Sequence, residues 1–262
     1  MPQIINLMEK KTLAKEAENI VENYLNLPAG LGCQTPYFNN LRRRSRGALL
    51  VLIGKGSPEE IAEEAKRFAL KDRVDLKNLP KETIKKFLVD YSLGVDCSGF
   101  AYHVLDAEVR ALKNQPLKKS IKIKGGLFRK LIAKLRPAGN IGVATLAFPE
   151  NSFEVDAAKA KPGDIIVFLG TGREQKYNHA LVVESVERDG NGTKIGYVNS
   201  YAWPSDGAYG HGVSRGKITV PAGAELLSGK WEEKGKTGTE NYTFLSAQKA
   251  KSVSLRRMNI LK

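Results

Sequence analysis

The chain has 262 residues, of which 42% are hydrophobic, and its formal net charge at pH 7 is +14. This hydrophobic content excludes wholesale disorder and can supply the core of one large domain or of two small ones. Two cysteines cannot form a disulfide framework, so Cys33 and Cys97 are predicted to be free thiols, although one bridge between them is formally possible.

The N-terminal segment MPQIINLMEKKTLAKEAENIV has no apolar stretch of signal-peptide length and carries acidic residues early. No window elsewhere approaches the roughly 18 consecutive apolar residues that cross a membrane. From these features we expect a soluble, cytoplasmic protein without an export leader or a membrane span.

Helical patterns dominate the first half of the chain. Acidic, basic and apolar residues at helical spacing predict an amphipathic helix over residues 7–25, and the Gly, Pro and Asn content of 27–40 predicts a loop. Ser57 as N-cap, Pro58 at the first helical position and Glu60 completing a capping box predict the start of another helix. Further helices are expected over 80–91, over 97–113 and over 124–135.

Short β-rich segments separated by turns make up the second half. They are GDIIVFLG at 163–170, HALVVESVE at 179–187, KIGYVNSY at 194–201, GVSRGKITV at 212–220 and SVSLRRMNIL at 252–261. Helices first and strands later predict an α+β fold with a mostly antiparallel sheet. We expect a single domain over residues 1–262 with a helical elaboration at about 41–90; a small N-terminal subdomain is the alternative.

The segment GVDCSGFAYHVL, residues 94–105, places Cys97 at the start of a predicted helix. A helix N-terminus has unpaired N–H groups and the positive end of the helix dipole. This field favours the thiolate, which is the nucleophilic form of cysteine. Cys97 is therefore a candidate nucleophile.

The three histidines of the chain are unequal candidates for a catalytic base. His103 lies six residues after Cys97, off the cysteine's helix face, and is predicted to be a packed residue. His211 lies in the Gly-rich segment AYGHGVS and is predicted to be an exposed loop residue. His179 begins an apolar strand, where it would be held in place yet reachable, although a structural role is an equal alternative.

Asn199 lies 20 residues after His179 and could orient its ring. If the intervening hairpin folds about Gly190, Asn199 stands opposite Leu181, on the same face as His179. A slip of one residue would put Asn199 on the wrong face. A turn residue at the strand end is the alternative interpretation of Asn199, and neighbouring Ser200 could be confused with it. Cysteine, histidine and asparagine in this order are typical of a triad for acyl transfer.

Five segments together match a known pattern. They are TPYFNN at 35–40, GVDCSGF at 94–100, KPGDIIVF at 161–168, NHALVVESV at 178–186 and GYVNSY at 196–201. Their content and order resemble the NlpC-type cysteine peptidases. The resemblance covers roughly residues 27–40 and 92–220.

This resemblance implies a papain-like α+β fold, in which a helix headed by the nucleophile packs on an antiparallel sheet, here with extra N-terminal helices. It implies that Cys97 is the nucleophile, His179 the base and acid, and Asn199 the orienting residue. The site would be lined by Tyr37, Asp96 and Ser98. The implied substrates are peptides of bacterial peptidoglycan, cut between D-glutamate and the following diamino acid. Neither a metal nor a cofactor is expected.

The chain also departs from the family pattern. Residues 41–90 lengthen the link between the tyrosine segment and the nucleophile, and could cap the cleft. The third triad residue of the family is often histidine, and members usually carry an export signal. The related CHAP amidases share a similar cysteine and histidine pattern.

Other functions are weighed from charge and motifs. The excess of Lys and Arg, densest in LRRRSR at 41–46, would attract an anionic polymer, whether nucleic acid, anionic lipid or an acidic cell-wall polymer. LLVLIGKGS lacks the glycine and the Ser/Thr of a phosphate loop, having Leu49 and Gly56 there, so nucleotide binding is rejected. Among the anionic polymers, nucleic acid is not the expected partner. A non-catalytic polyanion- or cell-wall-binding module and an acyltransferase are the alternatives to a hydrolase.

Overall fold

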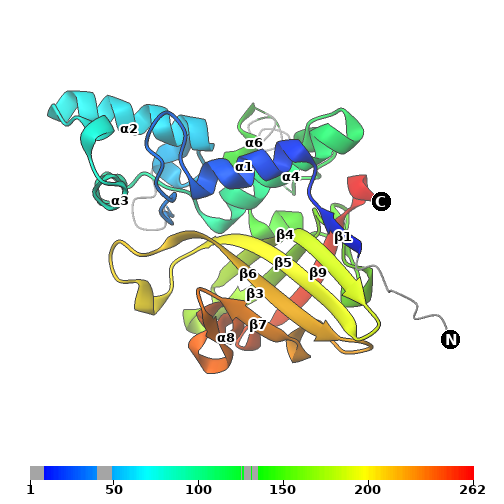
Figure 1. Ribbon diagram of the computed structural model, residues 1–262. Helices are drawn as coiled ribbons and strands as arrows, with labels where there is room; N and C mark the ends of the chain where they lie inside the picture. Colours follow the sequence, from blue (N-terminus) through cyan, green and yellow to red (C-terminus); the bar gives the residue numbers. More distant parts are fainter. Residues whose placement is uncertain (1–8, 40–48, 125, 127–130, 132–134) are drawn as a thin grey trace.

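The computed structural model describes residues 9–39, 49–124, 126, 131 and 135–262. In this part of the chain an antiparallel sheet of nine strands is covered by helices on one face and by a smaller cap on the other (Figure 1). The strands are β1 (Glu9–Thr12), β2 (Ser152–Glu154), β3 (Ile165–Thr171), β4 (Tyr177–Asp189), β5 (Gly192–Tyr201), β6 (Gly212–Pro221), β7 (Lys230–Glu233), β8 (Lys236–Thr237) and β9 (Ser252–Met258).

The strand order is β2-β9-β3-β4-β5-β6-β7-β8, and β1 pairs with β4. The described helices are α1 (Lys15–Leu25), α2 (Pro58–Asp72), α3 (Lys81–Asp90), α4 (Cys97–Lys113), α6 (Pro137–Asn140), α7 (Val143–Leu146) and α8 (Tyr242–Gln248). The expectation of an α+β fold with an antiparallel sheet is therefore confirmed. Among the described residues, no helix is both long enough and apolar enough to cross a bilayer.

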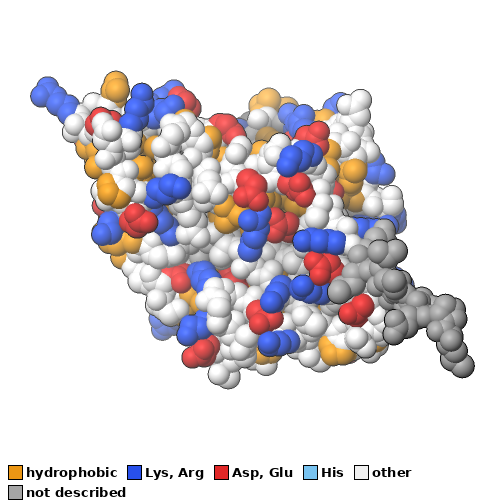
Figure 2. All heavy atoms as spheres, viewed as in Figure 1, with side chains coloured by type: hydrophobic (Ala, Val, Ile, Leu, Met, Phe, Trp, Pro, Cys, Tyr) orange, Lys and Arg blue, Asp and Glu red, His pale blue; other side chains and the backbone are white. Residues whose placement is uncertain are grey.

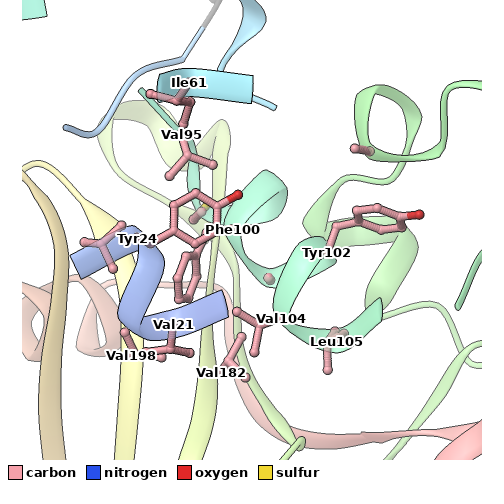
Figure 3. Close-up of a cluster of buried hydrophobic side chains, with 14 of the residues drawn as sticks. Val21, Tyr24, Ile61, Val95, Phe100, Tyr102, Val104, Leu105, Val182 and Val198 are labelled. Atoms are coloured by element: carbon pink, nitrogen blue, oxygen red, sulfur yellow. The ribbon is translucent and has the colours of Figure 1, made fainter. Parts of the chain in front are cut away.

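The larger core lies between the sheet and helices α1 and α4 (Figure 3). Tyr24 of α1 meets Phe100 of α4 edge to face, with their ring centroids 5.3 Å apart. Val182 of β4 and Val198 of β5 close this core from the sheet side. A second core on the opposite face includes Trp231 and packs against residues of α8. Helix α4 is thus fixed against the middle of the sheet.

Several local signals of the sequence are confirmed. The Ser57 side chain accepts a hydrogen bond from the Glu60 amide at 3.2 Å, and the Glu60 carboxylate accepts one from the Ser57 amide at 2.8 Å, so the predicted capping box starts α2. Helix α4 ends at Lys113, as expected. Cys33 and Cys97 are both free.

One helix boundary is wrong. The helix predicted over residues 7–25 is a strand over Glu9–Thr12 followed by a helix that begins only at Lys15. The strand forms because its backbone pairs with β4, where Glu9 lies opposite Arg188. Most of the helix predicted over 124–135 falls outside the described residues, as does the basic cluster at 41–46.

The KPGD segment has a structural role at the start of β3. Asp164 is buried and accepts hydrogen bonds from Nε and from an NH2 group of Arg257, each at 2.8 Å, as well as one from the Lys161 amide at 2.7 Å. These contacts join the start of β3 to β9, the strand beside it. Asp164 therefore helps to fix the strand that pairs with the histidine strand β4.

Candidate active site

The start of α4 is held by Asp96 and by a short segment from the 41–90 elaboration. The Asp96 side chain caps the helix by accepting from the Gly99 amide at 2.7 Å, and the Asp96 amide donates to the Gly54 carbonyl at 2.8 Å. A Cβ atom at position 99 would lie 2.7 Å from that carbonyl oxygen, so only glycine allows this close approach. The Gly54 segment is thereby packed directly against the helix turn that carries Cys97.

Cys97 is the first residue of α4 and is 7% exposed. Its Sγ atom lies 3.9 Å from the carbonyl oxygen of Asn178 in β4. The β4–β5 ladder ends at the Val182–Val198 pair, so this part of β4 lies beyond the ladder. Through its contact with Asn178, the Cys97 thiol touches the residue immediately before His179.

His179 pairs with Phe168 of β3 and is 2% exposed. Its imidazole stacks on the Tyr201 ring with centroids 4.0 Å apart and an interplanar angle of 24°. This stacking and the burial fix the plane of the ring. Its Nε2 atom is buried and has no partner in hydrogen-bond geometry.

The register of the β4–β5 hairpin changes along its length. Near the turn Asp189 pairs with Gly192, which centres the turn between residues 190 and 191. A bulge at Glu184 then shifts the pairing by one residue, so that Val182 pairs with Val198.

This bulge decides which face Asn199 occupies. With the shift, continuing the register puts Asn199 opposite Leu181, on the face of His179. Without it Asn199 would stand opposite Val182, on the other face. At this end of the hairpin the strands pair in the register expected for a turn centred on Gly190. The register results from the bulge, because the turn itself is centred between residues 190 and 191. Asn199 is fully buried.

The charge state of the pair differs from the sequence-based expectation. Burial, followed by the negative charge of Asp96, raises the pKa of the Cys97 thiol to about 12, against the opposing charge of Lys55. Burial lowers the pKa of His179 to about 3, against an opposing interaction with the Asn199 side chain. The pair is therefore neutral at pH 7. The backbone of Ser98 at the helix start does lower the pKa of Cys97, as the sequence predicts, but burial has the larger effect.

Lys55 is a site residue that the sequence analysis missed. Its Nζ atom lies 2.7 Å from Asp96 and also contacts the Ser98 hydroxyl, which itself donates to Asp96 at 3.0 Å. The side chains of Lys55 and Asp96 are only 12% and 16% exposed. His103 supports this arrangement, since its Nε2 atom lies 3.0 Å from the Lys55 carbonyl. Lys55 thus places a cation close enough to Cys97 to lower the pKa of its thiol.

Replacing Lys55 by methionine is expected to lower the free energy of unfolding by about 1.5–3 kcal/mol, because it removes a hydrogen-bonded charge partner from Asp96. Chemical denaturation would measure the loss. Lys66→Met is the matched control, since its ion pair with Glu63 is exposed and worth less than about 1 kcal/mol. Equal losses in both variants would contradict a structural role of the Lys55–Asp96 pair.

Cys97 and His179 line one cleft of about 720 Å³. The predicted residues Tyr37, Asp96 and Ser98 also line it, whereas the fully buried Asn199 does not. Other lining residues are Asn39, Val143, Thr171, Gly172, Arg173, Lys176, Tyr177, Asn178, Tyr201, Ala202 and Tyr242. Another groove, of about 620 Å³ along β2 and β9, has neither cysteine nor histidine in its described lining.

Tyr37 is held in the cleft from two sides. Its backbone amide donates to Nδ1 of His211 at 3.1 Å, and its hydroxyl accepts from the Asn39 amide group at 2.8 Å. Because the hydroxyl accepts from Asn39, its own proton can serve a ligand in the cleft. His211 lies in a loop, as predicted, but it is half-buried and holds the Tyr37 backbone, so the predicted exposure is wrong.

Comparison of the chain with protein-family models, with curated proteins and with solved structures finds no match. The geometry of this cleft is therefore the basis on which a function is proposed.

Proposed function

We propose that this protein is a cysteine hydrolase of amide bonds, with Cys97, His179 and Asn199 as its triad and a papain-like arrangement of helix and sheet. The observation that carries the proposal is that Cys97 and His179 line one cleft while the fully buried Asn199 side chain interacts with the His179 ring. A thiol at a helix start, a base on the adjoining strand and an orienting amide are the parts that acyl transfer needs.

The neutral pair supports a mechanism in which the proton moves during attack. As Sγ of Cys97 bonds to the substrate carbonyl carbon, its proton passes to His179. The C–N bond then breaks and the leaving amine takes that proton, which leaves a thioester. Water attacks the thioester, gives a proton to His179, and the thiol is restored as the acid product leaves.

The backbone offers a place for the oxyanion at the start of α4. The amides of Gly99 and Phe100 donate to Asp96, and the amide of Ser98 faces the thiol. We assign the Cys97 amide, with the Tyr37 hydroxyl, to the developing negative charge. Both are donors, as this role requires.

For the substrate we propose a peptide derived from bacterial peptidoglycan, cut after D-glutamate. The cleft has room for an extended peptide. Arg173 and Lys176 line it and share one carboxylate, that of Glu174, so one positive charge remains in excess there to attract a carboxylate of the substrate. A polyanion-binding module finds less support. Lys, Arg, Asp and Glu side chains are interspersed on the face in Figure 2. Arg215, for example, pairs with Glu22 and Glu184.

Cys97→Ala is expected to abolish cleavage of a peptide containing this bond, lowering the rate by at least about 10³-fold, because no other group can form the thioester. Mass spectrometry of the fragments and assay of the freed amine would measure it. Cys33→Ala is the matched control, since Cys33 is a buried thiol outside the cleft, and should keep activity.

Full cleavage by Cys97→Ala would overturn the proposal. So would a native protein that cleaves no such peptide but binds an anionic polymer, in a salt-sensitive way, equally well without Cys97. Conjugates formed with an added amine acceptor, in place of the free acid, would reassign the protein as an acyltransferase.

A further inference from the structure

A buried carboxylate contacts Asn199 of the proposed triad. Glu233, the last residue of β7, is 2% exposed. Three groups donate to it: the Tyr197 hydroxyl at 2.9 Å, the Ser214 hydroxyl at 2.6 Å and the Asn199 amide group at 3.2 Å. A charge buried at this depth is costly unless it is hydrogen-bonded, and these three donors meet that requirement.

The sheet register brings the donors together. Tyr197 of β5 pairs with Gly216 of β6, which in turn pairs with Glu233 of β7. A Cβ atom at position 216 would collide with the ring and hydroxyl of Tyr197. Glycine therefore opens the path by which Tyr197 crosses β6 to reach the carboxylate.

The carboxylate determines how the Asn199 amide is turned. An ionised carboxylate only accepts hydrogen bonds, so the NH2 group of Asn199 must face Glu233. Its Oδ1 atom must then point the other way. Oδ1 of Asn199 and Nε2 of His179 are both buried and lack a partner in hydrogen-bond geometry. The Asn199 side chain also raises the pKa of His179, against the effect of burial, as a polar group beside the ring would.

We propose that Glu233 is a positioning residue that orients Asn199 and thereby fixes the proton of neutral His179 on Nε2. An oxygen acceptor beside Nε2 stabilises the N–H there. Nδ1 then keeps its lone pair and can take the Cys97 proton. The catalytic meaning of this inference rests on the proposed hydrolase, but the tautomer is a property of the resting protein.

Nitrogen NMR of the 15N-histidine-labelled protein at neutral pH tests the tautomer directly. The chain has only three histidines, so the His179 signals can be assigned by their loss in His179→Gln. The native protein is expected to show a single Nε2–H tautomer. In Glu233→Gln, the new amide can donate as well as accept, so Asn199 can rotate and the Nδ1–H form should appear.

Glu232→Gln is the matched control, because Glu232 is the neighbouring carboxylate on β7 and pairs with Lys217 and Lys230 at the surface. It should leave the tautomer as in the native protein. In a peptide assay, Glu233→Gln is expected to lower kcat by at least about 10-fold with little change in KM, because a mistuned tautomer slows the chemical step.

A native Nδ1–H tautomer would overturn the inference, as would a Glu233→Gln protein that keeps Nε2–H alone. If Glu233→Gln does not fold, the native spectrum still decides, and Ser214→Ala, which removes one donor, provides the milder variant. If the tautomers are as expected but the protein has no peptidase activity, the positioning role of Glu233 stands and the hydrolase proposal is overturned. If the protein cleaves the peptide but the tautomers differ from those expected, only the positioning role is overturned.

Discussion

Cys97 in the resting protein is expected to react with a small alkylating reagent about 10²-fold more slowly at pH 8 than an ordinary thiol. A pKa of about 12 reduces the thiolate fraction by roughly 10³-fold relative to a thiol of pKa about 8.5. The greater nucleophilicity of the more basic thiolate recovers part of this loss. The rate should therefore rise steadily with pH from about 6 to 10, without a plateau.

Mass spectrometry of the modified peptide would measure the rate in a Cys33→Ala background, where Cys97 is the remaining thiol. Lys55→Met should slow the reaction further, because the Lys55 charge lowers the pKa of Cys97. Rapid alkylation at pH 6 with a plateau would instead mean that Cys97 and His179 form an ion pair. The helix N-terminus argument from the sequence would then outweigh burial.

Local patterns predicted many elements but not those that depend on distant pairing. The capping box at Ser57 needs only four consecutive residues, and the structure contains it. The strand at Glu9–Thr12 forms because β4, more than 160 residues away, offers its backbone. The sequence there carries helical spacing, so no local signal reveals the strand.

The candidate site was predictable as a set of residues, but not in its supporting contacts. The bulge at Glu184 has no distinct sequence signature, yet it places Asn199 on the correct face. Lys55 lies in the segment that fails to match a phosphate loop. The glycines on either side of it are the sequence signal of a close backbone approach at this point, because Gly54 has φ of 72° and packs against Phe38.

Glu233 had a usable signal that the sequence analysis did not exploit. In a strand, residues two apart share a face, so a buried Trp231 implies that Glu233 is buried on the same side. A lone buried glutamate needs donors, and β5 and β6 supply them. What the sequence lacked was the strand order that makes these three strands neighbours.

Acidification is expected to destabilise the protein through His179. A ring with pKa about 3 when folded and about 6.5 when unfolded binds no proton in the native state between these values, whereas the unfolded chain does. Stability is thus full above about pH 6.5 and falls as the pH drops toward 3. At pH 4 the loss amounts to about 3 kcal/mol.

His179→Gln should remove this contribution. Between pH 7 and pH 4, the free energy of unfolding of the variant should therefore fall by about 3 kcal/mol less than that of the native protein. Chemical denaturation at the two pH values would measure the difference. His211→Gln, which replaces a half-buried ring, is the control and should have a smaller effect. Equal acid sensitivity of native protein and His179→Gln would mean that the ring titrates as in the unfolded chain. A ring charged in the folded state would accompany a Cys97 thiolate, so this measurement and the alkylation profile must agree on whether the resting pair is neutral or ionic.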